Sequence, residues 1–176
     1  MQNLTSEYKN TLKNNGYVLG KGRTQIGVVM NDVGANQLAY TFITNVNEWQ
    51  KTNFGVDFCL FTQEYASPCM DPKFARFNIF DTSYFGGHLI TTSIQTFLNT
   101  QNAVKSKRYF YVNYLEYLRD KSKEHLYQEI MHDDNIVKIL RTKDYAEPLG
   151  ISSKQYYVLE DFDINSLIKI TQNYPR

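Results

Sequence analysis

The chain of 176 residues contains little cysteine, since Cys59 and Cys69 are its only two. Two cysteines at this separation, without a histidine pair beside them, fit no usual spacing of a zinc site. A domain of this size can bury roughly 70% of its unfolded surface, so it does not depend on a single disulfide. We therefore expect two reduced, partly buried thiols and no metal site.

The chain also lacks a charge excess and a long apolar run. Its 19 basic and 18 acidic residues leave a net charge of +1, whereas general nucleic-acid binding usually needs a basic surface. It has no run of about 18 apolar residues, which a membrane-spanning helix would need. The N-terminal residues 1–20 contain no apolar core of a signal peptide. These absences predict a cytoplasmic protein that binds neither nucleic acids in general nor a membrane.

The well-known catalytic and nucleotide-binding motifs are absent as well. The sequence has no glycine-rich dinucleotide fingerprint and no phosphate-binding P-loop. It also has no nucleophile elbow, no zinc-protease motif and no kinase signature. The function therefore has to be sought in residues that the fold brings together.

Aromatic residues, by contrast, are plentiful: 14 Tyr, 11 Phe and 1 Trp make up 15% of the chain. Many fall in short apolar runs that alternate with helical patterns, as strands and helices of an α/β domain do. The runs are 25–30, 56–62, 76–81, 88–93, 107–113, 135–141 and 155–160, and the helical patterns are 37–51, 94–104, 122–131, 143–149 and 164–170. Strands that alternate with helices pair in parallel through crossovers. We therefore expect a three-layer α/β/α sandwich with a mostly parallel, doubly wound (Rossmann-like) sheet of about six to seven strands.

The domain organisation follows from the same pattern. Residues 23–176 are expected to form a single domain, because no repeat and no low-complexity linker interrupts them. Residues 1–22 form an N-terminal extension, in which Leu4, Tyr8 and Leu12 favour a peripheral helix over 3–15.

Polar residues follow most of the predicted strands, and parallel sheets bind their ligands at the carboxyl ends of the strands. We expect this edge to bind a sugar or a phosphate. The candidate ligand-binding residues are Asn31, Asp32, Gly34 and Asn36 after the first strand; Asp81, Gly86 and Gly87 after the third; Thr92 and Ser93 after the fourth; Asn113 after the fifth; and Arg141 and Lys143 after the sixth. His88 and Glu116 are the candidate catalytic residues. His88 can act as a base or bind a phosphate, and Glu116 can act as a base or bind a sugar hydroxyl.

Each candidate also has a structural interpretation. Asn36 is a plausible N-cap of the following helix. Gly86 and Gly87 can have the purely structural role of permitting a turn. His88 at the start of a strand can be a structural residue, and Arg141 can form a surface salt bridge. These alternatives stay open at this point.

Four segments carry a resemblance to a known family. They are the run DTSYFGGHLITTS at 81–93, the run KRYFYVNYLEY at 107–117, and the strands at 136–142 and 157–161. Together they resemble the Rossmann-like half of a GT-B-type glycosyltransferase, of the kind seen in small proteins of tailed bacteriophages. The resemblance implies a nucleotide sugar as ligand, positive groups on the leaving phosphate and, for a viral protein, a location in the host cytoplasm.

The sequence departs from that family in having one half where a GT-B enzyme has two. A homo-oligomer or a second protein chain would have to complete the cleft, or the domain is a non-catalytic interaction or assembly module. Aromatic residues outside the predicted strands favour the latter: Tyr65, Tyr84, Phe85, Tyr114, Tyr117 and Tyr145. A third alternative is a small phosphohydrolase that uses Asp32 and Asp81.

Overall fold

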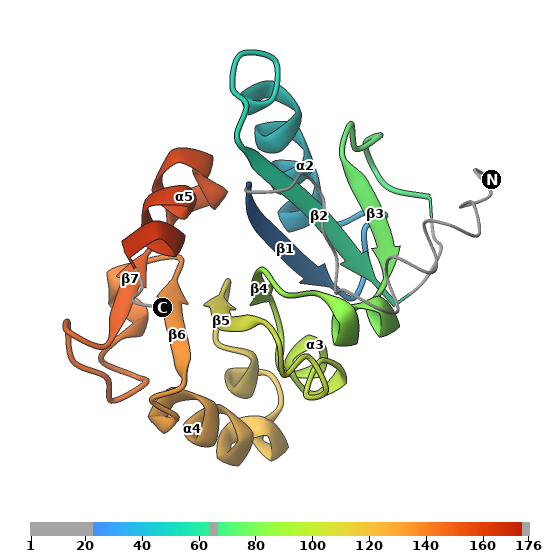
Figure 1. The fold of residues 1–176 in the computed structure, drawn as a ribbon. Coiled ribbons are helices and arrows are strands. Elements are labelled where there is room, and N and C mark those ends of the chain that lie inside the picture. The colour runs from blue at the N-terminus through green and yellow to red at the C-terminus, as the bar shows by residue number, and fades with distance from the viewer. Residues whose placement is uncertain (1–22, 64–66, 174–176) are drawn as a thin grey trace.

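The structure is a computed structural model that describes residues 23–63 and 67–173. Its centre is a seven-stranded sheet in the order β3-β2-β1-β4-β5-β6-β7, with every neighbouring pair parallel (Figure 1). The strands are β1 (Thr24–Met30), β2 (Val56–Thr62), β3 (Ala75–Asn78), β4 (His88–Thr91), β5 (Lys107–Val112), β6 (Ile136–Leu140) and β7 (Tyr156–Val158). The predicted parallel, doubly wound sheet is therefore confirmed.

The order of the strands reverses once, between β1 and β4. From β1 the chain proceeds outward through β2 to β3, and it then returns to place β4 on the other side of β1. β5, β6 and β7 follow in the opposite direction. This reversal is the topological switch point, where the loops after β1 and β4 diverge and leave room for a ligand.

Among the described residues, four α-helices cover the two faces of the sheet. They are α2 (Gln37–Trp49), α3 (Ile94–Asn99), α4 (Glu124–His132) and α5 (Ile164–Asn173). Alternate residues of β5 face opposite sides of the sheet. Tyr109 and Tyr111 pack in one apolar cluster with α2 and α5. Phe110 and Val112 pack with α3 and α4 in another. Most strand residues are buried on both faces, which explains why the strands are nearly continuous apolar runs.

Several predicted boundaries differ from the structure. The third strand was expected over 76–81 but ends at Asn78. The side chain of Asn78 accepts a hydrogen bond from the Phe80 amide (3.0 Å), and the Asp81 carboxylate accepts one from the Asn78 amide (3.2 Å). This reciprocal cap starts a short 3-10 helix, Ile79–Tyr84. The segment predicted as a helix over 143–149 contains only the 3-10 turn Lys143–Tyr145. The helix predicted over 3–15, and the extension 1–22 as a whole, lie outside the described residues.

Within the ranges that the structure describes, no helix has the length and apolar character to cross a membrane.

The two cysteines occupy different environments as free thiols. Cys59 lies in β2 with no exposed surface, and Cys69 is exposed in the connection to β3. Burial, assisted by the nearby charge of Asp57, raises the pKa of the Cys59 thiol.

We expect a thiol-specific reagent such as Ellman's reagent to modify only Cys69 in the folded protein. Cys59 is protected because it is both inaccessible and held as the unreactive thiol. The measurement is the thiol count before and after denaturation, with Cys69→Ser as the control that removes the fast reaction. Rapid labelling of native Cys69→Ser would contradict the burial of β2.

Candidate functional site

A hollow of about 130 Å³ lies at the carboxyl ends of β1 and β4, at the switch point of the sheet. The residues around it come from the loops after β1, β4 and β5 and from the first turn of α2. They are Met30, Asn31, Asn36, Leu38, Thr92, Ser93, Asn113 and Tyr114. Five of the predicted ligand-binding residues are among them, so the structure brings these five together.

Hydrogen bonds between the loops after β1 and β4 hold the two sides of this hollow at a defined separation. The Asn31 amide Nδ2 donates to Ser93 Oγ (3.0 Å). The Thr92 hydroxyl donates to the carbonyl oxygen of Val29 (2.8 Å). Ser93 is also the N-cap of α3, because its Oγ accepts from the Thr96 amide (3.1 Å). Asn31, Thr92 and Ser93 therefore shape the hollow through bonds within the protein.

The loop after β1 is organised by its own side chains. Asp32 Oδ1 accepts a hydrogen bond from the Gly34 amide (2.8 Å), which is a local turn typical of aspartate. Asn36 Oδ1 accepts from the amides of Leu38 (2.9 Å) and Ala39 (3.4 Å), so Asn36 is the N-cap of α2. Asp32 and Gly34 do not line the hollow.

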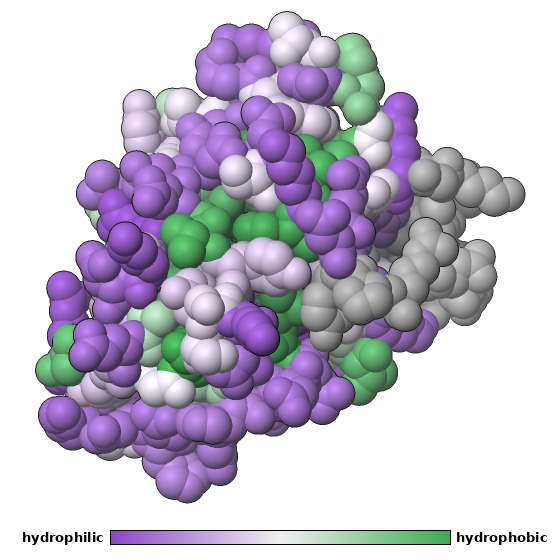
Figure 2. All heavy atoms as spheres, turned by 90° about the vertical axis from the view of Figure 1, so that its left-hand side faces the viewer, coloured by the Kyte–Doolittle hydropathy of each residue, from purple (hydrophilic) through white to green (hydrophobic). Residues whose placement is uncertain are grey.

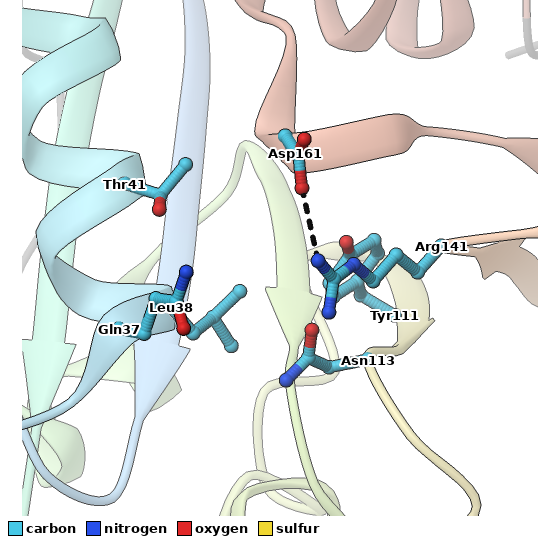
Figure 3. A pocket seen from close by; sticks show the side chains of 7 residues that line it. All are labelled: Gln37, Leu38, Thr41, Tyr111, Asn113, Arg141 and Asp161. Carbon is cyan, nitrogen blue, oxygen red and sulfur yellow. Dashed lines mark hydrogen bonds and ion pairs between the residues drawn. The ribbon is translucent and has the colours of Figure 1, made fainter.

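A second, smaller hollow of about 60 Å³ adjoins the first and shares Leu38 and Asn113 with it. Its lining comes from one side of α2 and from the ends of β5, β6 and β7: Gln37, Leu38, Thr41, Tyr111, Asn113, Arg141 and Asp161 (Figure 3). Arg141 Nη2 lies 3.1 Å from Asp161 Oδ1, and both side chains are largely exposed. We call the two hollows together the switch-point rim.

Two side-chain amides of the switch-point rim are available to a ligand. Gln37 and Asn113 have no side-chain hydrogen bond to any residue that the structure describes. Figure 3 shows that they approach the hollow from opposite sides, Gln37 from α2 and Asn113 from the end of β5. Since each amide carries both donors and an acceptor, the pair can bind hydroxyl groups.

The backbone beside Arg141 adopts an uncommon conformation. Asp161 and Phe162 have φ values of 45° and 51°, in the left-handed region that non-glycine residues rarely adopt. Phe162 is fully buried, with its ring centroid 4.5 Å from that of Tyr111. Asn45 Nδ2 donates to the carbonyl oxygens of Asp161 (2.8 Å) and Phe162 (3.1 Å). The core thus holds the backbone in the conformation that directs the Asp161 carboxylate to Arg141.

Sequence reasoning missed part of this hollow. Gln37, Thr41 and Tyr111 were not among the candidate ligand-binding residues, although Gln37 and Thr41 lie one turn apart on the helix that Asn36 caps. Their spacing was the signal that could have identified them. Tyr111 could not be found in this way, because it belongs to an apolar strand. Burial raises the pKa of its phenol, which donates to the Leu159 carbonyl (3.2 Å).

The expectation that Gly86, Gly87 and His88 lie at the carboxyl edge of the sheet with the other candidate residues is wrong. β4 begins at His88, which pairs with Ile26 and Lys107 near the starts of β1 and β5. All three residues therefore lie at the amino edge of the sheet, opposite the switch-point rim. Gly87 has a packing role, because a Cβ there would come within 2.5 Å of the Gln25 carbonyl oxygen.

Glu116 also lies away from the switch-point rim. Its carboxylate is buried, with Oε1 accepting a hydrogen bond from the Ile94 amide (3.1 Å) at the start of α3. Oε2 lies 3.8 Å from Lys123 Nζ. Burial raises the pKa of Glu116, and the bond from Ile94 and the charge of Lys123 oppose this rise. Glu116 lines neither hollow and secures the helix that follows β4.

Two more candidates lie outside the switch-point rim. Asp81 accepts the Asn78 amide in the reciprocal cap after β3, and burial raises the pKa of its carboxyl. Lys143 is exposed in the 3-10 turn after β6 and lines neither hollow. Of the two cationic candidates, only Arg141 therefore faces the rim.

Among residues 23–63 and 67–173, no group of three or more His, Cys, Asp or Glu side chains could hold a metal ion. The aromatic residues beyond the strands divide into two groups. Phe85 and Tyr117 are buried in the core, whereas Tyr84 and Tyr114 are exposed. Tyr145 is half-buried, and Tyr65 lies outside the described residues.

Comparison of the chain with protein-family models, with curated protein sequences and with solved structures gives no match. The functional argument therefore depends on the geometry of the chain itself.

We expect Glu116→Ala to lower the free energy of unfolding by about 1–3 kcal/mol, because it leaves the buried Ile94 amide without an acceptor. Glu116→Gln keeps an acceptor oxygen and should cost much less. Chemical denaturation monitored by circular dichroism measures both.

The pH dependence separates the two variants further. Because the folded pKa of Glu116 is raised, the folded state binds the carboxyl proton more tightly than the unfolded state does. This group's contribution to stability should fall as the pH rises from the unfolded pKa through the folded pKa. Glu116→Gln should remove that fall, and equal losses in both variants at every pH would refute the capping role.

Proposed function

We propose that this protein binds the sugar or phosphate part of a nucleotide sugar or a related ligand at the switch-point rim, as a glycosyltransferase-like Rossmann domain. The observation that carries the proposal is the position of Asn113, which lines both hollows and whose side-chain amide has no protein partner among the described residues. In open parallel sheets this position, beyond the carboxyl ends of the strands at the switch point, is where ligands bind.

The chemistry of the lining supports a sugar or phosphate ligand. The amides of Gln37 and Asn113 and the hydroxyl of Thr41 can exchange hydrogen bonds with sugar hydroxyls. Arg141 supplies a guanidinium that can form two parallel hydrogen bonds with a phosphate. Its present partner, Asp161, is exposed, and an exposed ion pair stabilises the protein by only about 0–1 kcal/mol. A phosphate can therefore replace or join this carboxylate at little cost.

The dimensions of the rim suit part of a ligand. Volumes of about 130 Å³ and 60 Å³ are below the roughly 300–1,000 Å³ of a complete small-molecule pocket. A bound nucleotide sugar would thus remain partly uncovered. This agrees with a GT-B-like half whose cleft is completed by a homo-oligomer or by another chain.

The residues that line the rim suit a binding site, and neither candidate catalytic residue is among them. His88 lies at the opposite edge, and the Glu116 carboxylate is occupied by Ile94 and Lys123. Asp161 is the carboxylate of the second hollow. In the proposed function this chain binds and orients the ligand, and a facing subunit would supply a base for sugar transfer.

Isothermal titration calorimetry with UDP-glucose, UDP-N-acetylglucosamine and GDP-mannose tests the proposal. We expect at least one of these to bind, and Arg141→Gln to weaken its binding about 10-fold or more through loss of a charge-assisted contact. Asn113→Ala should weaken it less, through loss of neutral hydrogen bonds.

Lys143→Gln is the matched control. It removes a neighbouring positive charge that does not line the rim, so it should leave the affinity unchanged within about twofold. The absence of binding by all three nucleotide sugars, or equal losses for Arg141→Gln and Lys143→Gln, would refute the proposal.

A second candidate function is protein assembly through the β7 edge. β7 ends the sheet, and its residues Tyr157 and Val158 are 37% and 40% exposed. Figure 2 shows the side of the molecule that carries β7, where apolar side chains are visible in the middle with polar ones around them. An uncovered edge strand with apolar side chains readily pairs with another strand. A second copy of this chain, related by a two-fold axis, could pair β7 with β7.

If this edge mediates self-association, Val158→Lys should convert the dimer to a monomer, because a charged side chain on the paired edge strand opposes its burial. Sedimentation velocity measures the change. Val104→Lys is the control, since Val104 is 83% exposed and lies in the connection between α3 and β5. A wild-type protein that is monomeric at high micromolar concentration would exclude this assembly.

A further inference from the structure

The first hollow of the switch-point rim differs in its chemistry from the second. None of the described residues that line the first hollow carries a charge, whereas Arg141 and Asp161 both line the second. The apolar part of the first lining comes from Met30, Leu38 and Tyr114. Because an ion loses its hydration in such surroundings without gaining a partner, an uncharged ligand group suits the first hollow better than a phosphate does.

Most polar side chains of the first hollow are already bonded within the protein. Asn36 caps α2 with its side-chain oxygen, and its Nδ2 donates to the carbonyl oxygen of Asp32 (3.3 Å). The Thr92 hydroxyl is bonded to the backbone of β1, and the Ser93 hydroxyl caps α3. A ligand group in this hollow would therefore gain contact with apolar surface more than it would gain hydrogen bonds.

Tyr114 is the aromatic residue of this lining. It follows the end of β5 and is 41% exposed. Its backbone is anchored, because the hydroxyl of the buried Tyr127 on α4 donates to the carbonyl oxygen of Tyr114 (3.0 Å). Among residues 23–63 and 67–173, the side chain of Tyr114 has no hydrogen bond and no contact with another aromatic ring. The packing of the core thus does not account for this ring.

The guanidinium of Arg119 lies over the Tyr114 ring, with Cζ 4.9 Å from the ring centroid. Such a cation–π contact stabilises one orientation of an exposed aromatic side chain. Arg119 lies over one face of the ring, and a planar ligand group can stack on the other.

The order of the side chains along the rim matches the parts of a nucleotide. Tyr114 lines only the first hollow, Asn113 lines both, and Arg141 lines only the second. A ligand that spans both hollows therefore meets an aromatic ring, then a side-chain amide, then a guanidinium. A nucleotide presents its base, its ribose and its phosphate in the same order.

We propose that Tyr114 is the platform on which a nucleobase stacks, so that the rim binds a nucleotide with its base in the first hollow and its sugar and phosphate in the second. This inference rests on the function proposed above and adds the class and the orientation of the ligand. The base is uncharged, so its binding does not need an unpaired cation. Because every base has a π face and the first hollow offers few free hydrogen-bonding groups, the site tolerates different bases.

The test is isothermal titration calorimetry of the full chain with uridine 5′-monophosphate, guanosine 5′-monophosphate and glucose 1-phosphate, which has no base. We expect the two nucleotides to bind with affinities within about tenfold of each other, and glucose 1-phosphate to bind about tenfold or more weakly than either. Tyr114→Ala should weaken the binding of both nucleotides about tenfold, through loss of stacking, and should change that of glucose 1-phosphate by less than about twofold.

Two further variants separate stacking from other effects of the substitution. Tyr114→Phe keeps the ring and removes only the hydroxyl, so it should bind both nucleotides as the wild type does. Tyr84→Ala is the matched control, because Tyr84 is also an exposed tyrosine, at 36%, but lines neither hollow. It should leave all three affinities unchanged.

Nuclear magnetic resonance of the ligand gives a second readout. A base that stacks on an aromatic ring has its protons shifted upfield by the ring current. We expect this shift for the H6 proton of uridine 5′-monophosphate with the wild type and with Tyr114→Phe, and its loss with Tyr114→Ala.

The failure of this inference differs from the failure of the proposed function. If Arg141→Gln weakens the binding of all three ligands while Tyr114→Ala changes none, the rim binds a sugar phosphate and the base platform is overturned. Equal losses for Tyr114→Ala and Tyr84→Ala, or binding of one nucleotide more than about a hundredfold tighter than the other, would also overturn it. The absence of binding by all three ligands would contradict the proposed function and this inference with it.

Discussion

The parallel pairing of β1 with both β2 and β4 is the constraint on which the rest of this structure depends. It places β1 inside the sheet, with five consecutive residues buried and neighbours on both sides. The same pairing creates the switch point, because the chain leaves β1 in one direction and returns to its other side at β4. Gly27 shows how closely this region packs, since a Cβ there would come within 2.7 Å of the Phe61 ring. The position of the switch-point rim is therefore a consequence of how the core is built.

Polar residues at the carboxyl edge serve two purposes, which the hydrogen bonds distinguish. Asn36 and Ser93 cap helices, and Thr92 bonds to the β1 backbone, so these side chains are occupied by the protein. Gln37 and Asn113 are not occupied in this way among the described residues. A ligand would interact most readily with the second group. The buried Tyr111 and Phe162, which support the backbone of Asp161, connect this edge to the core.

The two edges of the sheet differ in character. The carboxyl edge carries amides, hydroxyls and one Arg–Asp pair around small hollows. The amino edge carries a larger hollow with basic side chains. Parallel strands make this difference possible, because all seven carboxyl ends meet on one edge and all seven amino ends on the other.

The sequence by itself determined the fold class, most strand positions and the cap of α2. These follow from local physics: apolar runs form buried strands, and Asn36 satisfies the free amides of a helix start. Only the tertiary structure decided which polar residues meet. A connection in a parallel sheet must return from the carboxyl edge to the amino edge, so Gly86, Gly87 and His88, late in such a connection, lie opposite Asn113. Glu116 turns inward because the amide of Ile94, twenty-two residues earlier, needs an acceptor there. Long-range pairings of this kind leave no periodic signal in the sequence, because they depend on where separate elements pack together.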